Sequence, residues 1–325
     1  MKQLSPSQRL TTYYANWIQL YKQDAVQPQT LLKYDSALAW LTQLAPNLTL
    51  AQLNRMQYQA LLNAYATTHE RSTTNDFHHH LKAALLDALD EGLLTSDPTR
   101  RVVIKGKKPR PKKAKYLNED QLTRLIATFQ LDQGLNDDWL LLLIIKTGLR
   151  FAEALALTPA DFNLDKGLLT INKTWNYRRP SGGFKPTKNP SSNRVLALDP
   201  DTTAAFDALL KPLAPDDLLF VHGPVYNSTL NIRLKHHCEQ ADVPVITIHS
   251  LRHTHASLLL YAGVSIASVA QRLGHASITT TQRTYLHIIQ ELAIKDDHKM
   301  MHELHALTPP ACLKATPAKK MSPAD

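Results

Sequence analysis

Residues 247–263, TIHSLRHTHASLLLYAG, place three histidines and an arginine at the start of a segment that continues as an apolar helix. Polar side chains at the start of a buried helix need partners, because burial without hydrogen bonds costs free energy. Three explanations compete: a metal site, a helix cap with solvated side chains, and a cluster gathered around an anion. The rest of the sequence decides between them.

The metal explanation depends on His249 and His253, which stand four residues apart as in zinc-binding helices. Such a helix also carries a glutamate directly after the first histidine as general base, and Ser250 stands there instead. No Asp or Glu occurs between residues 243 and 290. The other histidine-rich stretch, FHHH at 77–80, has adjacent residues that point in different directions on a helix. The sequence therefore disfavours a metal site.

The anion explanation joins the 247–263 segment to distant residues. His249 and Arg252 share one helix face, at a helix N-terminus where free N–H groups favour negative charge. In TGLRFAEALAL, Arg150 follows the helix-ending Gly148, and Glu153 comes one turn later. Three more polar residues belong to the same hypothesis, one at a hairpin and two after the 247–263 segment: Lys188, His275 and Tyr285.

Composition limits the function classes. The net charge of +9 favours a polyanionic partner, most often nucleic acid; the alternative is a basic enzyme with a solvated surface. The two cysteines, Cys238 and Cys312, form no CxxC pair, which argues against a disulfide framework and fits a reducing cytosol. The N-terminus has no signal-peptide core, and the longest apolar run, at 139–145, is too short to span a bilayer. We therefore expect a cytoplasmic protein with no membrane partner.

The chain divides into two expected domains. Apolar periodicity predicts a bundle of four helices within residues 1–99, and residues 100–116 form a basic, proline-containing linker. The second domain, 117–309, is expected to begin with Asn118 as N-cap and Gln121 three residues later. It combines helices with short antiparallel strands over 168–198, and a disordered tail follows at 310–325. The predicted fold class is mainly α with a small antiparallel β-sheet.

The linker offers cations to a phosphate backbone, although a solvated spacer is the alternative. Its candidate DNA contacts are Lys105, Lys107, Lys108, Arg110, Lys112 and Lys113.

Taken together, the anion-binding residues resemble the active-site set of the tyrosine recombinases, the phage integrase family. The matching stretches are TGLRFAEALAL, TKNPSSNR, HSLRHTHAS, LGH and TYLH, in the family's order over about residues 145–290. The resemblance implies a core-binding, SAM-like helical bundle followed by a tyrosine-recombinase catalytic domain. Two departures stand out: Ser250 replaces the acidic residue of many members, and the bundle starts too near Met1 for a preceding arm-site domain.

The resemblance implies transesterification at a DNA phosphodiester. Tyr285 would attack phosphorus, with Arg150 and Arg252 holding the non-bridging oxygens and Glu153 orienting Arg150. His249 could accept the tyrosine proton, and His275 would donate to a phosphate oxygen. The resemblance assigns Lys188 as the acid that protonates the leaving 5′-oxygen. His253 and His255 are expected to be structural or to contact phosphate.

The product would be a 3′-phosphotyrosyl enzyme, formed without metal or ATP, so no cofactor is expected. The implied partners are double-stranded DNA, a homotetramer on paired sites, and accessory DNA-bending or excision factors. The implied role is integration or excision of a phage or other mobile element, including viral genome integration. An amphipathic segment at 288–307 is expected to dock on a neighbouring protomer or on its own domain. Alternatives are a type IB topoisomerase, a DNA-binding protein without catalysis, and a zinc hydrolase.

Overall fold

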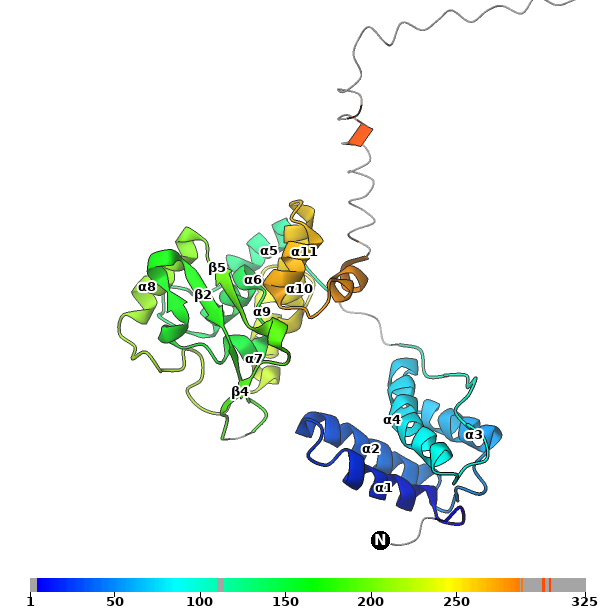
Figure 1. Ribbon diagram of the computed structural model, residues 1–325. Helices are drawn as coiled ribbons and strands as arrows, with labels where there is room; N and C mark the ends of the chain where they lie inside the picture. Colours follow the sequence, from blue (N-terminus) through cyan, green and yellow to red (C-terminus); the bar gives the residue numbers. More distant parts are fainter. Residues whose placement is uncertain are drawn as a thin grey trace, which may run out of the picture. The chain divides into compact units, whose positions relative to one another are not determined.

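The computed structural model describes residues 5–109, 114–179 and 181–286, together with residues 288, 300, 301 and 304. Contacts divide the chain into two compact units, Met1–Lys112 and Lys113–Asp325 (Figure 1). The amphipathic segment at 288–307, apart from those four single residues, and the tail at 310–325 lie outside the described residues.

Four helices build the first unit: α1 (Leu10–Tyr21), α2 (Pro28–Leu44), α3 (Arg55–Ala66) and α4 (Arg71–Asp90). Pro28 begins α2 where its missing N–H costs nothing, and the Asn54 side chain caps α3 by accepting from two backbone N–H groups. Most aromatic side chains of α1 and α3 are buried, and Tyr14 and Tyr58 are among the largest fully buried groups. The bundle predicted from apolar spacing is present in this unit.

The start of the basic linker is attached to the first unit rather than free. The side-chain amide of Gln59 donates to the Val103 carbonyl at 2.9 Å and accepts from the Val103 N–H at 2.8 Å. The Lys107 N–H donates to the His69 carbonyl at 2.8 Å. Gly106 lies so close to Arg71 that a Cβ there would overlap its backbone nitrogen. Backbone up to Lys107 is therefore part of this fold, which the charge pattern did not reveal.

The second unit begins with α5 (Glu119–Ile126), α6 (Asp137–Thr147) and the short α7 (Phe151–Ala154). Asn118 and Gln121 form the predicted capping box. Helix α6 ends at Gly148, which adopts φ 69° in the left-handed region. Most of α6 is buried because α10 (Ile248–Tyr261) packs along it. A helix with apolar residues on nearly every side is stable only when enclosed in this way.

Short antiparallel strands follow α7, and they form two sheets where the sequence predicted one. The first sheet has the order β1 (Phe162–Asn163), β2 (Leu168–Ile171), β5 (Arg194–Ala197). The second pairs β3 (Lys173–Trp175) with β4 (Phe184–Pro186). The pairing changes from the first sheet to the second after Ile171, the last residue of β2. Lys173 is then held by an ion pair to Asp161 at 2.7 Å.

Helices complete the second unit: α8 (Pro200–Leu210), α9 (Asn227–Gln240), α10, α11 (Ile266–Leu273) and a further helical stretch at 278–286. Three 3-10 turns, η1 (Pro159–Asp161), η2 (Leu164–Lys166) and η3 (Pro190–Ser192), lie beside the strands. The fold is thus mainly α with small antiparallel sheets, which confirms the predicted class. Within the described residues, no helix combines the length and apolar character needed to span a membrane.

Candidate active site

The first arginine of the site lies inside the protein. Arg252, on the second turn of α10, is only 3% exposed. Its guanidinium donates to the Gly148 carbonyl and to the Leu273 carbonyl, both at 2.7 Å. Burial, and after it the charge of Arg150, lowers the pKa of Arg252 to about 9. The group is therefore still charged at neutral pH, and burial makes an anionic partner favourable for it.

The second arginine is fixed by a buried carboxylate. Arg150 precedes α7 and donates to Glu153 through Nη1 at 2.6 Å and through its backbone N–H at 3.0 Å. Glu153 is 1% exposed, and Arg194 Nη2 donates at 2.9 Å to Oε2, the oxygen that also accepts from the Arg150 backbone N–H. Burial alone would raise the pKa of Glu153, but the two arginines outweigh it and lower the pKa. The carboxylate is therefore ionised between two cations.

A run of backbone carbonyls at the end of α11 connects these arginines to His275. Arg194 Nε donates to the Arg272 carbonyl at 2.7 Å, Arg252 to the Leu273 carbonyl, and Arg150 Nη2 to the Gly274 carbonyl at 3.1 Å. Carbonyls at a helix C-terminus lack partners inside the helix and carry partial negative charge. The three guanidinium groups therefore lie around one helix end, directly before His275.

His275 is half-buried on the turn after α11, and its Nδ1 lies 2.7 Å from the Thr281 hydroxyl. Burial comes first among the causes that lower the pKa of His275 to about 4, followed by the charges of Arg252 and Arg150. The imidazole is therefore neutral at pH 7. A neutral imidazole whose Nδ1 accepts from Thr281 would keep an N–H at Nε2 to donate elsewhere.

The tyrosine of the site is buried against α10. Tyr285 is 2% exposed, and its hydroxyl lies 2.9 Å from Nδ1 of His253. Burial raises the pKa of Tyr285 to about 12, although the charge of Arg252 acts in the opposite direction. His253 packs edge-to-face on His249, with ring centroids 4.7 Å apart. Burial, followed by His249 and Arg252, lowers the pKa of His253 to about 4.

Lys188 occupies a different setting from the other predicted residues. It is exposed, in the connection from β4 to β5, two residues before η3. The same connection contacts the site through the Ser192 hydroxyl, which accepts from Arg150 at 3.3 Å. The sequence placed Lys188 at a hairpin; the structure places it just beyond the β3–β4 pair, on the segment that approaches Arg150.

The structure brings together the arginines, His249, His275 and Tyr285, as the anion hypothesis required. Reasoning from sequence missed two contributors, His253 at the tyrosine hydroxyl and Arg194 at Glu153. The sequence held one signal for Arg194, its position six residues after Lys188 in the same quoted stretch. His255 is structural, because its ring lies between the Ile145 carbonyl at 2.8 Å and Arg272 Nε at 3.0 Å.

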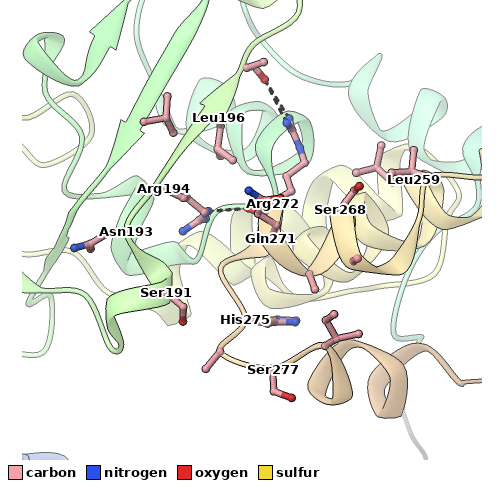
Figure 2. A pocket seen from close by; sticks show the side chains of 17 residues that line it. Ser191, Asn193, Arg194, Leu196, Leu259, Ser268, Gln271, Arg272, His275 and Ser277 are labelled. Atoms are coloured by element: carbon pink, nitrogen blue, oxygen red, sulfur yellow. Dashed lines mark hydrogen bonds between the residues drawn. The ribbon is translucent and has the colours of Figure 1, made fainter.

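Two hollows adjoin these residues. One, of about 760 Å³, is bordered by β5, α11 and His275 (Figure 2). The other, of about 460 Å³, is bordered by His249, His253, Tyr285 and Lys115. Among the described residues, no group of His, Cys, Asp and Glu side chains is arranged to hold a metal ion.

The linker cations fall into two sets. Lys105, Lys107 and Lys108 are exposed at the edge of the first unit. Arg110, Lys112 and Lys113 lie outside the described residues.

Comparison with known proteins agrees with this geometry. The model of the phage integrase family matches residues 115–291, which contain the whole constellation. The chain belongs to the phage integrase family. Similar members include tyrosine recombinase XerD of Neisseria meningitidis serogroup A, 33% identical over 61% of this chain and 66% of that protein. XerD of Ralstonia nicotianae is 30% identical over 71% of this chain and 75% of its own length.

Solved structures of other integrases share the fold. The Tn1549 transposon integrase in complex with a circular intermediate DNA gives a TM-score of 0.72 at 18% identity, over 85% of this chain and 95% of that one. The lambda integrase tetramer bound to a Holliday junction gives 0.63 at 16% identity, over 85% and 77% of the two chains. These likenesses place both units of this phage integrase family member within a known architecture.

Proposed function

We propose that this chain is a site-specific DNA recombinase that breaks and rejoins DNA through a 3′-phosphotyrosyl intermediate. The observation that carries the proposal is the gathering of Arg150, Arg252 and neutral histidines beside a buried tyrosine hydroxyl. Cations fixed before the substrate arrives stabilise the charge that develops on a phosphate without further reorganisation. The DNA complexes of the similar integrases support double-stranded DNA as the substrate.

We propose the following roles for the individual residues. Tyr285 is the nucleophile, Arg150 and Arg252 hold the non-bridging oxygens, and His275 donates to one of them. Lys188, exposed and free to reach a bound duplex, protonates the leaving 5′-oxygen. Glu153 fixes Arg150 through their ion pair. The bond energy is retained in the phosphotyrosine, so the reaction requires neither ATP nor a metal.

Proton transfer from the tyrosine depends on the substrate. Sequence reasoning assigned His249 as the acceptor, but the hydroxyl faces His253, with His249 behind it. The raised pKa of Tyr285 and the lowered pKa of His253 make direct proton transfer between them unfavourable in the free protein. A bound phosphate would raise the pKa of both histidines. We propose that the His253–His249 pair accepts the proton only once DNA is in place.

The wider assembly also belongs to the proposal. The first unit and the linker cations bind the duplex, and protomers act as a homotetramer on paired sites in the bacterial cytoplasm. The lambda integrase tetramer on a Holliday junction supports this arrangement. Integration or excision of a mobile element, with accessory DNA-bending or excision factors, is the proposed role.

Covalent trapping tests the mechanism. Tyr285→Phe removes one hydroxyl, so folding and DNA binding should persist while the protein–DNA adduct disappears from a denaturing gel. Lys188→Ala should slow cleavage, and a substrate with sulfur at the 5′-bridging position should restore it, because sulfur leaves without an acid. The sulfur substrate should not restore Tyr285→Phe. An adduct formed by Tyr285→Phe, or loss of the wild-type adduct in EDTA, would show that the mechanism is wrong.

The topoisomerase alternative shares these residues and differs in outcome. A recombinase should relax or exchange DNA only at its own sites, whereas a type IB topoisomerase relaxes supercoils in plasmids of any sequence. Relaxation of several unrelated plasmids at equal rates would favour the alternative.

A further inference from the structure

Arg194 begins β5 and has no solvent-facing role, since its side chain is only 6% exposed. All of its guanidinium nitrogens are engaged. Nε donates to the Arg272 carbonyl at 2.7 Å, Nη1 to the Ser192 carbonyl at 2.8 Å, and Nη2 to Glu153 at 2.9 Å. Figure 2 shows Arg194 reaching from β5 to the last turn of α11, beside the turn that carries His275.

Two routes lead from Arg194 to Arg150. The first passes through Glu153, whose Oε1 accepts from the Arg150 guanidinium while Oε2 accepts from Arg194 and from the Arg150 backbone N–H. By binding Oε2, Arg194 sets the orientation of the carboxylate and therefore the direction from which Oε1 meets the Arg150 guanidinium. The second route passes through the end of α11, where Arg194 holds the Arg272 carbonyl and Arg150 holds the Gly274 carbonyl. Gly274 is packed tightly here, because a Cβ would come within 3.0 Å of Arg194 Nη1.

Charge strengthens this arrangement. The positive charges of Arg150 and Arg252 repel each other. Glu153 carries the negative charge that Arg150 and Arg194 share. A planar guanidinium can bind three acceptors in fixed directions, which an ammonium group cannot reproduce. The position therefore requires arginine for its geometry as well as for its charge.

We propose that Arg194 is a positioning residue for DNA cleavage, which sets the Arg150 guanidinium through Glu153 and the end of α11. This role rests on the proposed function, because Arg150 is assigned there to the scissile phosphate. Arg194 itself touches no substrate.

The test compares Arg194→Lys with a matched control, Arg233→Met. Arg233 also pairs with a fully buried carboxylate, Asp138 at 2.8 Å, but on α9 and away from the site. Adduct formation is measured in a single turnover with saturating protein, on oxygen-bridged and 5′-sulfur-bridged DNA. We expect Arg194→Lys to be at least tenfold slower on both substrates with DNA affinity within twofold of wild type. Arg233→Met should lose stability but cleave normally.

A spectroscopic readout separates this role from the chemistry. With ¹⁵N-labelled arginine, the Nε–H signal of Arg150 should shift or broaden in Arg194→Lys and stay unchanged in Arg233→Met. Arg194→Gln should show the same effects if the lysine variant folds poorly. An unchanged Arg150 signal, unchanged cleavage, or rescue by the sulfur substrate would overturn the proposal; rescue would mean that Arg194 acts on the Lys188 segment. Because the signal is recorded without DNA, its outcome is independent of whether Tyr285 is the nucleophile.

Discussion

His255 should make the catalytic unit sensitive to acid. Its Nδ1 faces the Ile145 carbonyl at 2.8 Å and its Nε2 accepts from Arg272 at 3.0 Å, an arrangement that fits only the neutral ring. Burial, followed by the charge of Arg272, lowers the pKa of His255 from 6.5 to about 4. Below pH 6.5 the imidazole of His255 binds a proton in the unfolded chain, whereas in the folded protein it stays neutral until the pH approaches 4. Stability is therefore complete above that pH and is lost as the pH falls towards 4.

The size of the effect follows from the same two values. A folded pKa of about 4 against 6.5 for the unfolded chain gives a loss of about 2 kcal/mol between pH 7 and pH 5. His255 also packs on Gly148, where a Cβ would lie 2.6 Å from the imidazole Cδ2. The carbonyl of Gly148 binds Arg252, so protonation should loosen the arginine cluster as well as α10.

Hydrogen exchange of α10 amides, corrected for the intrinsic rate at each pH, measures this loss locally. Glutamine in His255→Gln keeps a donor and an acceptor but does not titrate. Between pH 7 and pH 5, the free energy of opening α10 should therefore fall by about 2 kcal/mol less in this variant than in wild type. His236→Gln, on the exposed side of α9, serves as the control and should behave like wild type. If wild type and His255→Gln lose the same protection on acidification, the assignment of a neutral buried ring is wrong.

Three other outcomes are expected. The first change neutralises four linker cations, Lys107, Lys108, Lys112 and Lys113. DNA binding should weaken for every sequence alike, and the slope of log affinity against log salt concentration should fall by about 0.9 for each phosphate that the linker no longer neutralises. An unchanged slope would mean that the linker is only a spacer. Removing residues 290–325 should leave single-site binding intact and impair the paired-site complex on a native gel, whereas normal pairing would place that segment on its own protomer. Gly106→Ala should detach the linker from Arg71 and speed proteolysis within residues 100–109, while Gly223→Ala, whose Cβ meets nothing within 4 Å, should not.

Local features were predictable from sequence because their partners are near in the chain. The Asn118–Gln121 capping box and the end of α6 at Gly148 depend on three or four residues each, and both are present. The catalytic constellation was predictable for another reason, since its motifs keep a recognisable order. Neither local patterns nor motif order reveals contacts between side chains that are far apart in the sequence. His253 meets Tyr285 across 32 residues, and Arg194 meets Glu153 across 41.

The pairing of the strands and the attachment of the linker to the first unit could not be predicted from the sequence either. The sequence predicted short antiparallel strands in one small sheet over 168–198, but nothing in it showed that β2 and β3 pair in separate sheets. The basic composition of residues 100–116 suggested an extended linker along a phosphate backbone, with a solvated spacer as the alternative. Near its start the linker is bound to α3 because the side-chain amide of Gln59 makes two hydrogen bonds with the backbone of Val103. A contact of this kind leaves no periodic pattern in the sequence.

The acceptors at the end of α11 have a consequence for how this region can evolve. Arginines 150, 194 and 252 bind main-chain carbonyls there, and every residue type supplies a carbonyl. A substitution at these acceptor positions would therefore leave the carbonyl bonds to the arginines in place, provided that the helix still ends at the same residue. Gly274 is the exception, since its φ of 66° and its contact with Arg194 exclude a side chain. In a mutational scan, Arg272 and Leu273 should therefore be constrained by their side chains, which bind His255 and fill the buried core, and not by the carbonyls that they present to the arginines.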